Sequence, residues 1–199
     1  MSKSGGQKVI LSIRAALLIL CLSSVPVQAQ FISLWADSSM NSCSVFPGPP
    51  PNNTFDMYIF IEPDARGIVG VEFSIVNPSP SLFLTPPGTP VFNPAAGVVG
   101  PLGDFFGNGI TMAFRHCQYD PIWVARYNFT SFEAGAVFFT LGVTTSSDPP
   151  VTQETIRAAI CDVPHTVVEA FAYNHFGINQ ACVVGTEESS WGAIKSLYR

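Results

Sequence analysis

The segment FDMYIFIE at 55–62, followed after a short turn by VGVEFSIV at 69–76, decides the fold of this chain. Large apolar residues occupy every second position in both segments: Phe55, Met57, Ile59 and Ile61, then Val69, Val71, Phe73 and Ile75. Successive side chains of a strand point to opposite faces, so this alternation predicts two half-buried β-strands. Glu72 and Ser74 fall between the apolar positions and point to the other face of the strand.

Similar short segments rich in β-branched and aromatic residues continue along the chain. They lie at 31–36, 110–115, 122–129, 137–143, 155–161 and 166–173. Proline-rich stretches such as 47–51 and 77–80 separate them, and proline ends strands. The pattern predicts an all-β fold with two antiparallel sheets packed as a sandwich. Residues 85–108, rich in Pro and Gly, are expected to form a long loop over a sheet edge.

The first 29 residues have the features of a cleavable signal peptide. Lys3, Lys8 and Arg14 form a positive region, and the apolar run AALLILCL at 15–22 follows it. This run is shorter than the ~20 residues that a membrane-spanning helix needs. Small residues precede a predicted cut after Ala29. We therefore expect an exported protein with one β-sandwich domain over 30–186.

The charge of the expected mature chain argues against nucleic-acid binding. Without the three cations of the leader, six Lys and Arg remain against 14 Asp and Glu, a net charge of −8. Such a surface repels phosphate backbones. No second hydrophobic span follows the leader, so no membrane span is expected in the mature chain.

Four cysteines remain after the leader, at positions 43, 117, 161 and 182. An even number in an oxidising compartment predicts two disulfides. Four cysteines allow three connectivities, and we favour Cys43–Cys117 with Cys161–Cys182, because the second pair closes a short loop. The sequence contains no CxxC, which disfavours redox chemistry and zinc ribbons.

The last residues, EESSWGAIKSLYR at 187–199, differ in character from the rest. Trp191, Ile194 and Tyr198 fall at helical spacing, while Lys195 and Arg199 lie at the end that favours cations. The pattern predicts a short amphipathic C-terminal helix. It either docks on the sandwich or serves as a sorting or attachment tag.

Two resemblances follow from these motifs. The succession of TFDMYIFIE, a small-residue turn at 65–67, GVEFSIVNP and GAVFFTLGV resembles cohesin-like and carbohydrate-binding β-sandwich proteins of bacteria. The whole chain is similar to a group of uncharacterised secreted bacterial proteins. Those proteins share a cysteine after an N-terminal segment like SLWAD at 33–37, and a tail like SSWGAIKSLYR. The resemblances imply a cohesin- or immunoglobulin-like sandwich in an extracellular protein.

Motifs for catalysis or metal binding are sparse. The chain contains neither HExxH nor GxSxG, so zincin and nucleophile-elbow hydrolases are not indicated. Asp162, His165 and His175 are close in sequence and could meet, although exposed turn histidines are the simpler interpretation. The segment DSSMN at 37–41 resembles the start of a calcium loop but lacks its glycine and glutamate. We therefore expect no metal site and no cofactor.

Aromatic side chains are the best candidates for ligand contact. Tyr58 and Phe60 face away from the apolar side of their strand, and Trp123 and Tyr127 lie on another predicted strand. Such rings either bind a partner or pack in the core. We expect a secreted, non-enzymatic protein, located in the periplasm, at the cell surface or in the extracellular space, that binds an unidentified protein or carbohydrate. A secreted hydrolase and a structural component of the cell envelope are the alternatives.

Overall fold

The computed structural model describes residues 29–46, 53–76, 89–131, 135–147, 150–152 and 155–184. These residues form an all-β fold with one short 3-10 turn, Pro94–Ala96. No helix among them is long and apolar enough to cross a membrane. The predicted C-terminal helix at 187–199 lies outside the described residues, as does the leader up to residue 28.

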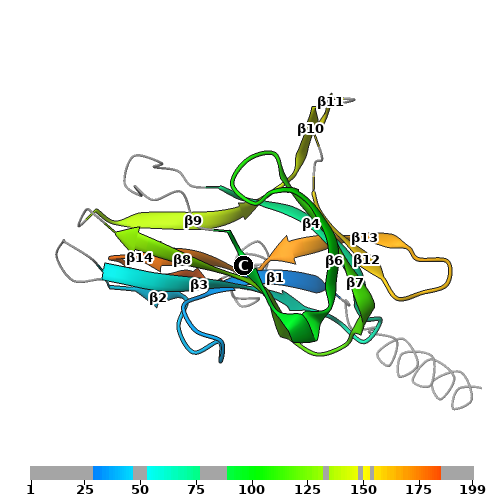
Figure 1. The fold of residues 1–199 in the computed structure, drawn as a ribbon, viewed down its shortest axis with the longest axis horizontal. Coiled ribbons are helices and arrows are strands. Elements are labelled where there is room, and N and C mark those ends of the chain that lie inside the picture. The colour runs from blue at the N-terminus through cyan, green and yellow to red at the C-terminus, as the bar shows by residue number, and fades with distance from the viewer. Residues whose placement is uncertain are drawn as a thin grey trace, which may run out of the picture.

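Fifteen strands are found in the described residues (Figure 1). They are β1 Gln30–Trp35, β2 Ser44–Val45, β3 Asn53–Glu62, β4 Ile68–Val76, β5 Val91–Phe92, β6 Val98–Asp104, β7 Gly109–Gln118, β8 Ile122–Ser131, β9 Val137–Gly142, β10 Thr145–Ser147, β11 Pro150–Thr152, β12 Ile156–Ile160, β13 Val167–Ala172, β14 Asn174–Ile178 and β15 Val183–Val184. All eight strands predicted from alternation are confirmed.

Backbone pairing runs in the order β5-β8-β3-β1-β13-β12-β4-β7-β6. One layer contains β1, β3 and β8, and the other contains β12, β4 and β7. The end of β4 leaves β12 and pairs with β9, which pairs in turn with β14. The two layers enclose the core, as the alternation of 55–62 and 69–76 predicts.

Phenylalanine rings fill the space between the layers. Phe55 of β3 stacks on Phe176 of β14 with ring centroids 6.1 Å apart, and Phe129 of β8 lies 5.3 Å from Phe139 of β9. Phe105, from the turn before β7, contacts Phe73 of β4 at 5.6 Å. These contacts join strands far apart in sequence, so the core depends on the overall topology.

The expected loop over 85–108 is wrong within the part described, residues 89–108. Asn93 accepts a hydrogen bond from the backbone N–H of Ala95 and donates one to the carbonyl of Trp123, which caps the 3-10 turn and fixes it to β8. β6 then pairs with β7 as an edge strand. The Pro and Gly residues concealed this strand because they disfavour regular pairing.

The predicted disulfide pairing is also wrong. The structure joins Cys43 to Cys182 and Cys117 to Cys161, with Cα atoms 5.6 and 5.9 Å apart. β2 runs parallel to β14, and the carbonyl of Cys43 accepts a hydrogen bond from the N–H of Gly177, which brings Cys43 beside the C-terminal segment. Loop length alone could not reveal this neighbourhood.

The second disulfide, Cys117–Cys161, joins the ends of β7 and β12. Both strands pair with Ile68, at the start of β4 and on its two sides. The two cysteines therefore meet where β4 begins, and their bond clamps the three strands together.

Candidate functional site

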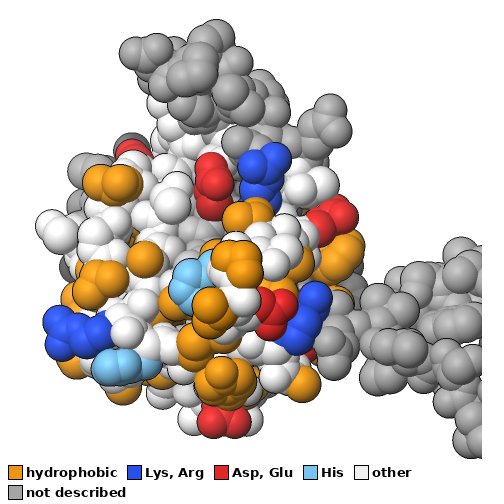
Figure 2. All heavy atoms as spheres, turned by 90° about the vertical axis from the view of Figure 1, so that its right-hand side faces the viewer, with side chains coloured by type: hydrophobic (Ala, Val, Ile, Leu, Met, Phe, Trp, Pro, Cys, Tyr) orange, Lys and Arg blue, Asp and Glu red, His pale blue; other side chains and the backbone are white. Residues whose placement is uncertain are grey.

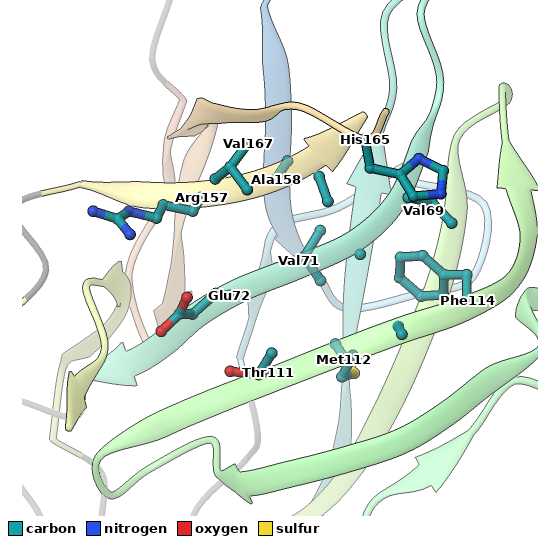
Figure 3. A pocket seen from close by; sticks show the side chains of 13 residues that line it. Val69, Val71, Glu72, Thr111, Met112, Phe114, Arg157, Ala158, His165 and Val167 are labelled. Atoms are coloured by element: carbon teal, nitrogen blue, oxygen red, sulfur yellow. The ribbon is translucent and has the colours of Figure 1, made fainter. Parts of the chain in front are cut away.

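A groove lies on the outer face of β12, β4 and β7 (Figure 3). The strand register places Ala159, Gly70 and Ala113 side by side across these three strands. Their side chains are small, so the sheet surface is low at this point. The hollow has a volume of about 360 Å³, within the range of ~300–1,000 Å³ that is common for binding pockets.

Polar and charged groups occupy one end of the groove. Arg157, Glu72 and Thr111 form the next row across the same strands, and Figure 3 shows them together at that end. The Glu72 carboxylate accepts a hydrogen bond of 2.5 Å from the hydroxyl of Thr144, which fixes its position. An acid and a base at one end of an apolar hollow would orient a bound group.

The other end of the groove is apolar apart from one histidine. His165, Val69 and Phe114 lie near one another there (Figure 3). The ring Nδ1 of His165 lies 3.1 Å from the carbonyl oxygen of Ile160, which holds the ring against the turn after β12.

Exposed apolar side chains border the groove on both sides. Val167 of β13 pairs with Ala159 and is 60% exposed, and Val99 of β6 pairs with Ala113. Leu102, also on β6, is 71% exposed. Figure 2 views the end of the molecule that lies on the right in Figure 1, and it shows hydrophobic side chains there among charged ones and histidine. A row of apolar residues thus crosses β13, β12, β4, β7 and β6.

The opposite outer face, on β1, β3 and β8, is rich in aromatic rings. Tyr58 and Trp123 meet edge to face with centroids 5.6 Å apart. Trp35 stacks with Tyr173 at 6.3 Å. All four rings are half-buried. We call these residues the aromatic face, and it includes two of the four aromatic residues predicted from sequence to bind a ligand.

Charged groups lie beside the aromatic face. Arg126 is 3.6 Å from the carboxylate of Asp56, which also accepts a hydrogen bond from Asn128. The pKa of Arg126 is raised by its hydrogen bond to Tyr58 and by the charge of Asp56. The guanidinium thus remains charged next to the rings.

Phe60 and Glu62 differ from the other outward residues of β3 because they are largely covered. Phe60, placed between Ser33 and Trp123 in the register, is only 3% exposed. Burial raises the pKa of Glu62, and the hydrogen bond from the Ser33 hydroxyl partly opposes that shift. The indole N–H of Trp35 donates to the same hydroxyl at 2.8 Å.

Tyr127, the fourth aromatic residue predicted to bind a ligand, lies in the core instead. It is 4% exposed and contacts Phe105 and Phe106 at 5.4 and 5.2 Å. The register Met57↔Tyr127 places it on the core side of the sheet. Because the register shifts at a bulge between Ile59 and Phe60, Tyr127 and Trp123 point to opposite sides of the sheet. The sequence does not reveal this bulge.

The candidate metal ligands do not gather. Asp162, His165 and His175 belong to no cluster that could hold a metal ion among the residues described. The carboxylate of Asp37 accepts hydrogen bonds from the backbone N–H groups of Ser39, Asn41 and Ser42, at 2.8 to 3.3 Å. The segment DSSMN therefore forms a turn closed by the Asp37 carboxylate.

The sequence interpretation missed the groove. Its signal is the presence of small residues at outward positions of three strands, Gly70, Ala113 and Ala159, where alternation leads one to expect polar side chains. Recognising the hollow also requires knowing that β12, β4 and β7 are neighbours, which the sequence does not show.

Comparison with solved structures identifies a similar fold. The chain resembles cohesin modules. The cohesin module of a family 33 glycoside hydrolase from Clostridium perfringens aligns with 77% of this chain and 98% of its own, at 12% identity and a TM-score of 0.48. The seventh ScaB type I cohesin from Pseudobacteroides cellulosolvens aligns with 80% of this chain and 96% of its own, at 11% identity and 0.47.

A further match is a type I cohesin–dockerin complex from Clostridium thermocellum, with 76% of this chain and 92% of the other covered, 12% identity and a TM-score of 0.43. No family model matches the sequence, and no curated protein matches it. The resemblance to cohesins expected from the strand motifs is thus found among solved structures, and it says nothing of which residues bind.

Proposed function

We propose that this protein is an extracellular binding module that docks a protein partner on the outer face of β12, β4 and β7. The observation that carries the proposal is the groove over Gly70, Ala113 and Ala159, with exposed Val167 and Val99 beside it. Two disulfides and the predicted leader support a location outside the cytoplasm.

The physical case rests on how interfaces are built. An apolar pocket at the centre of an interface accepts an anchoring side chain, and charged groups at the rim select the partner and its orientation. The groove supplies the pocket, while Arg157 and Glu72 supply charges of both signs at one end. A row of exposed apolar residues extends the contact beyond the groove, as an interface of ~800 Å² per partner requires.

A pair of matched substitutions tests this proposal. The partner is captured from the culture fluid of the source organism and purified, and its Kd is measured by calorimetry. Val167→Asp, at the groove, should weaken binding at least ~10-fold, the effect of losing one strong interface contact. Val91→Asp is the control, because Val91 is 49% exposed on β5 of the other layer. Equal affinity of both variants and the wild type would refute the proposal.

We propose glycan binding on the aromatic face as the second candidate function. The observation that favours it is the fixed orientation of the rings: the indole N–H of Trp35 is bound to Ser33, and Tyr58 is bound to Arg126. The negative faces of fixed rings attract the polarised C–H groups of a sugar at little entropic cost. Asp56 and Asn128 would bind hydroxyl groups.

Affinity electrophoresis in gels that contain hydroxyethylcellulose, glucomannan or dextran tests the second candidate. The wild type should be retarded by at least one polysaccharide, and Trp123→Ala should restore mobility. Tyr119→Ala is the control, because Tyr119 is an exposed ring beyond the end of β7. Absence of retardation in all three gels, or equal retardation of both variants, would exclude this function. Val167→Asp should leave the retardation unchanged, which separates the two candidates.

A further inference from the structure

Gln30 is the first residue of β1 and directly follows the predicted cleavage site at Ala29. It is fully buried, with 0% of its surface exposed. Its side-chain carbonyl oxygen accepts a hydrogen bond of 3.1 Å from the backbone N–H of Asp64. Its side-chain amide nitrogen, Nε2, is buried without a hydrogen-bond partner. No other side chain among the described residues has a buried polar atom without a partner.

A buried amide nitrogen without a partner is unfavourable, because folding removes its hydrogen bonds to water and does not replace them with hydrogen bonds in the protein. Exceptions of this kind in folded proteins call for an explanation. The position of Gln30 suggests one. If the leader is removed after Ala29, the glutamine becomes the first residue of the chain, and its own α-amine can react with its side chain.

We propose that Gln30 is the mature N-terminus and that it cyclises to pyroglutamate. The α-amine nitrogen attacks the side-chain carbon Cδ, and a new N–Cδ bond closes a five-membered lactam. The Cδ–Nε2 bond breaks, and Nε2 leaves as ammonia after taking one proton from the attacking amine. No oxidant, reductant or other reactant is needed.

Cyclisation would relieve the unfavourable burial of the Gln30 amide nitrogen. Cyclisation removes the unpaired Nε2 and keeps a carbonyl oxygen as an acceptor. It also removes the positive charge of the α-amine, which would otherwise lie at the start of a strand whose first residue is buried. The ring requires the side chain to fold back on its own nitrogen. It therefore closes before β1 pairs with β13 and β3, or when the first residue of β1 detaches.

Intact-mass spectrometry of the exported protein tests the proposal. The full chain, including its leader, is produced in a bacterial host and purified from outside the cytoplasm. The expected mass is that of residues 30–199 with two disulfides, less one ammonia. A chain that starts elsewhere, or that retains the leader, would overturn both the start and the cyclisation. A chain that starts at Gln30 and remains linear after prolonged incubation would overturn the cyclisation alone.

The variant Gln30→Glu is the matched control. Glutamate keeps a carboxyl oxygen and the chain length but cyclises far more slowly, because its ionised carboxylate is a poor electrophile and water, not ammonia, would have to leave. It should begin at the same position with the linear mass. As a second readout, linear wild-type protein separated early by ion exchange should melt at a lower temperature than the cyclised form. An equal or higher melting temperature would refute the penalty assigned to Nε2.

Discussion

Glu62 lies on the outer face of β3 with its carboxylate largely withdrawn from water, and burial raises its pKa. Its folded-state pKa therefore exceeds that of the unfolded chain, so the folded state binds the proton more tightly. This contribution to stability is present at low pH and is lost as the pH rises through the folded-state pKa. The charged form is the costly one at neutral pH.

Glu62→Gln should therefore melt at a higher temperature than the wild type at pH 7, and the difference should shrink toward pH 4. Glutamine is neutral at both values and can still accept the hydrogen bond from Ser33. Melting curves by circular dichroism across this range measure the effect. Glu169→Gln, an exposed position on β13, should show no such pH-dependent gain. A lower melting temperature of Glu62→Gln at pH 7 would contradict this account.

Phe176 and Phe171 are close in sequence but differ in surroundings. Phe176 is fully buried between Phe55 and Phe139, whereas Phe171 is 44% exposed. Phe176→Ala should lower the free energy of unfolding by about 3–5 kcal/mol, because it removes buried area and leaves a cavity. Phe171→Ala should cost about 1 kcal/mol or less. Urea unfolding of both variants gives the comparison, and similar losses would contradict the placement of the core.

At the scale of elements, local alternation predicted the strands but not how they join. β13 pairs with β1 up to Ile32, and the chain then turns away into β14. Among the described residues, Leu34 consequently has no backbone partner on that side. The side chain of Asn174 takes this role, accepting a hydrogen bond from the Leu34 N–H and donating one to its carbonyl, both at 2.8 Å. No periodicity in the sequence marks this contact.

Asn174→Ala should destabilise the protein by at least ~2 kcal/mol, because it leaves both backbone groups of Leu34 buried without partners, at about 1–3 kcal/mol each. Asn128→Ala is the control, since Asn128 is exposed and bonds to the exposed side of Asp56. It should cost less than ~0.5 kcal/mol. Thermal or urea unfolding measures both. Equal stability of the two variants would show that Asn174 is not needed at this junction.

β6 is an edge strand that, within the described residues, pairs with β7 alone. Pro101 lacks the N–H that would bind another strand, and the register shifts between Val99 and Leu102. Gly103 has a φ of 103°, a conformation that favours glycine. Proline and bulges on an exposed edge prevent sheets from adding to each other.

Pro101→Thr should therefore increase aggregation, because it adds a donor and a β-branched residue next to the exposed Leu102. Light scattering during incubation at a fixed concentration measures the effect. The control is Pro121→Thr, an exposed proline that precedes β8 and does not lie on an edge strand. Faster aggregation of the control, or equal rates for both, would contradict this role of Pro101.

For the whole molecule, the sequence predicted the class of fold and eight strands because alternation is a local property. It placed Tyr58 and Phe60 on the outer side of β3, which the register supports. It failed for Tyr127, the groove and the disulfides, because these depend on a bulge, on strand order and on contacts between distant residues. Cys43 and Cys182 are 139 positions apart, and nothing local indicates that they meet.

The two disulfides should stabilise the molecule unequally. Cys43–Cys182 closes a loop across a sequence separation of 139, whereas Cys117–Cys161 closes one of 44. If each bond acts by restricting the unfolded chain, removal should cost about 5 kcal/mol for the first and about 4 for the second. The double variants Cys43→Ser with Cys182→Ser, and Cys117→Ser with Cys161→Ser, are to be compared by urea unfolding.

Non-reducing peptide mapping of the wild type provides the check on pairing and should recover peptides that join Cys43 to Cys182 and Cys117 to Cys161. Peptides that join Cys43 to Cys117 would contradict the parallel pairing of β2 with β14, because that pairing holds Cys43 beside the C-terminal segment. Equal or reversed losses with the pairing intact would instead show that the clamp over the start of β4 stabilises the native strands themselves, beyond its effect on the unfolded chain.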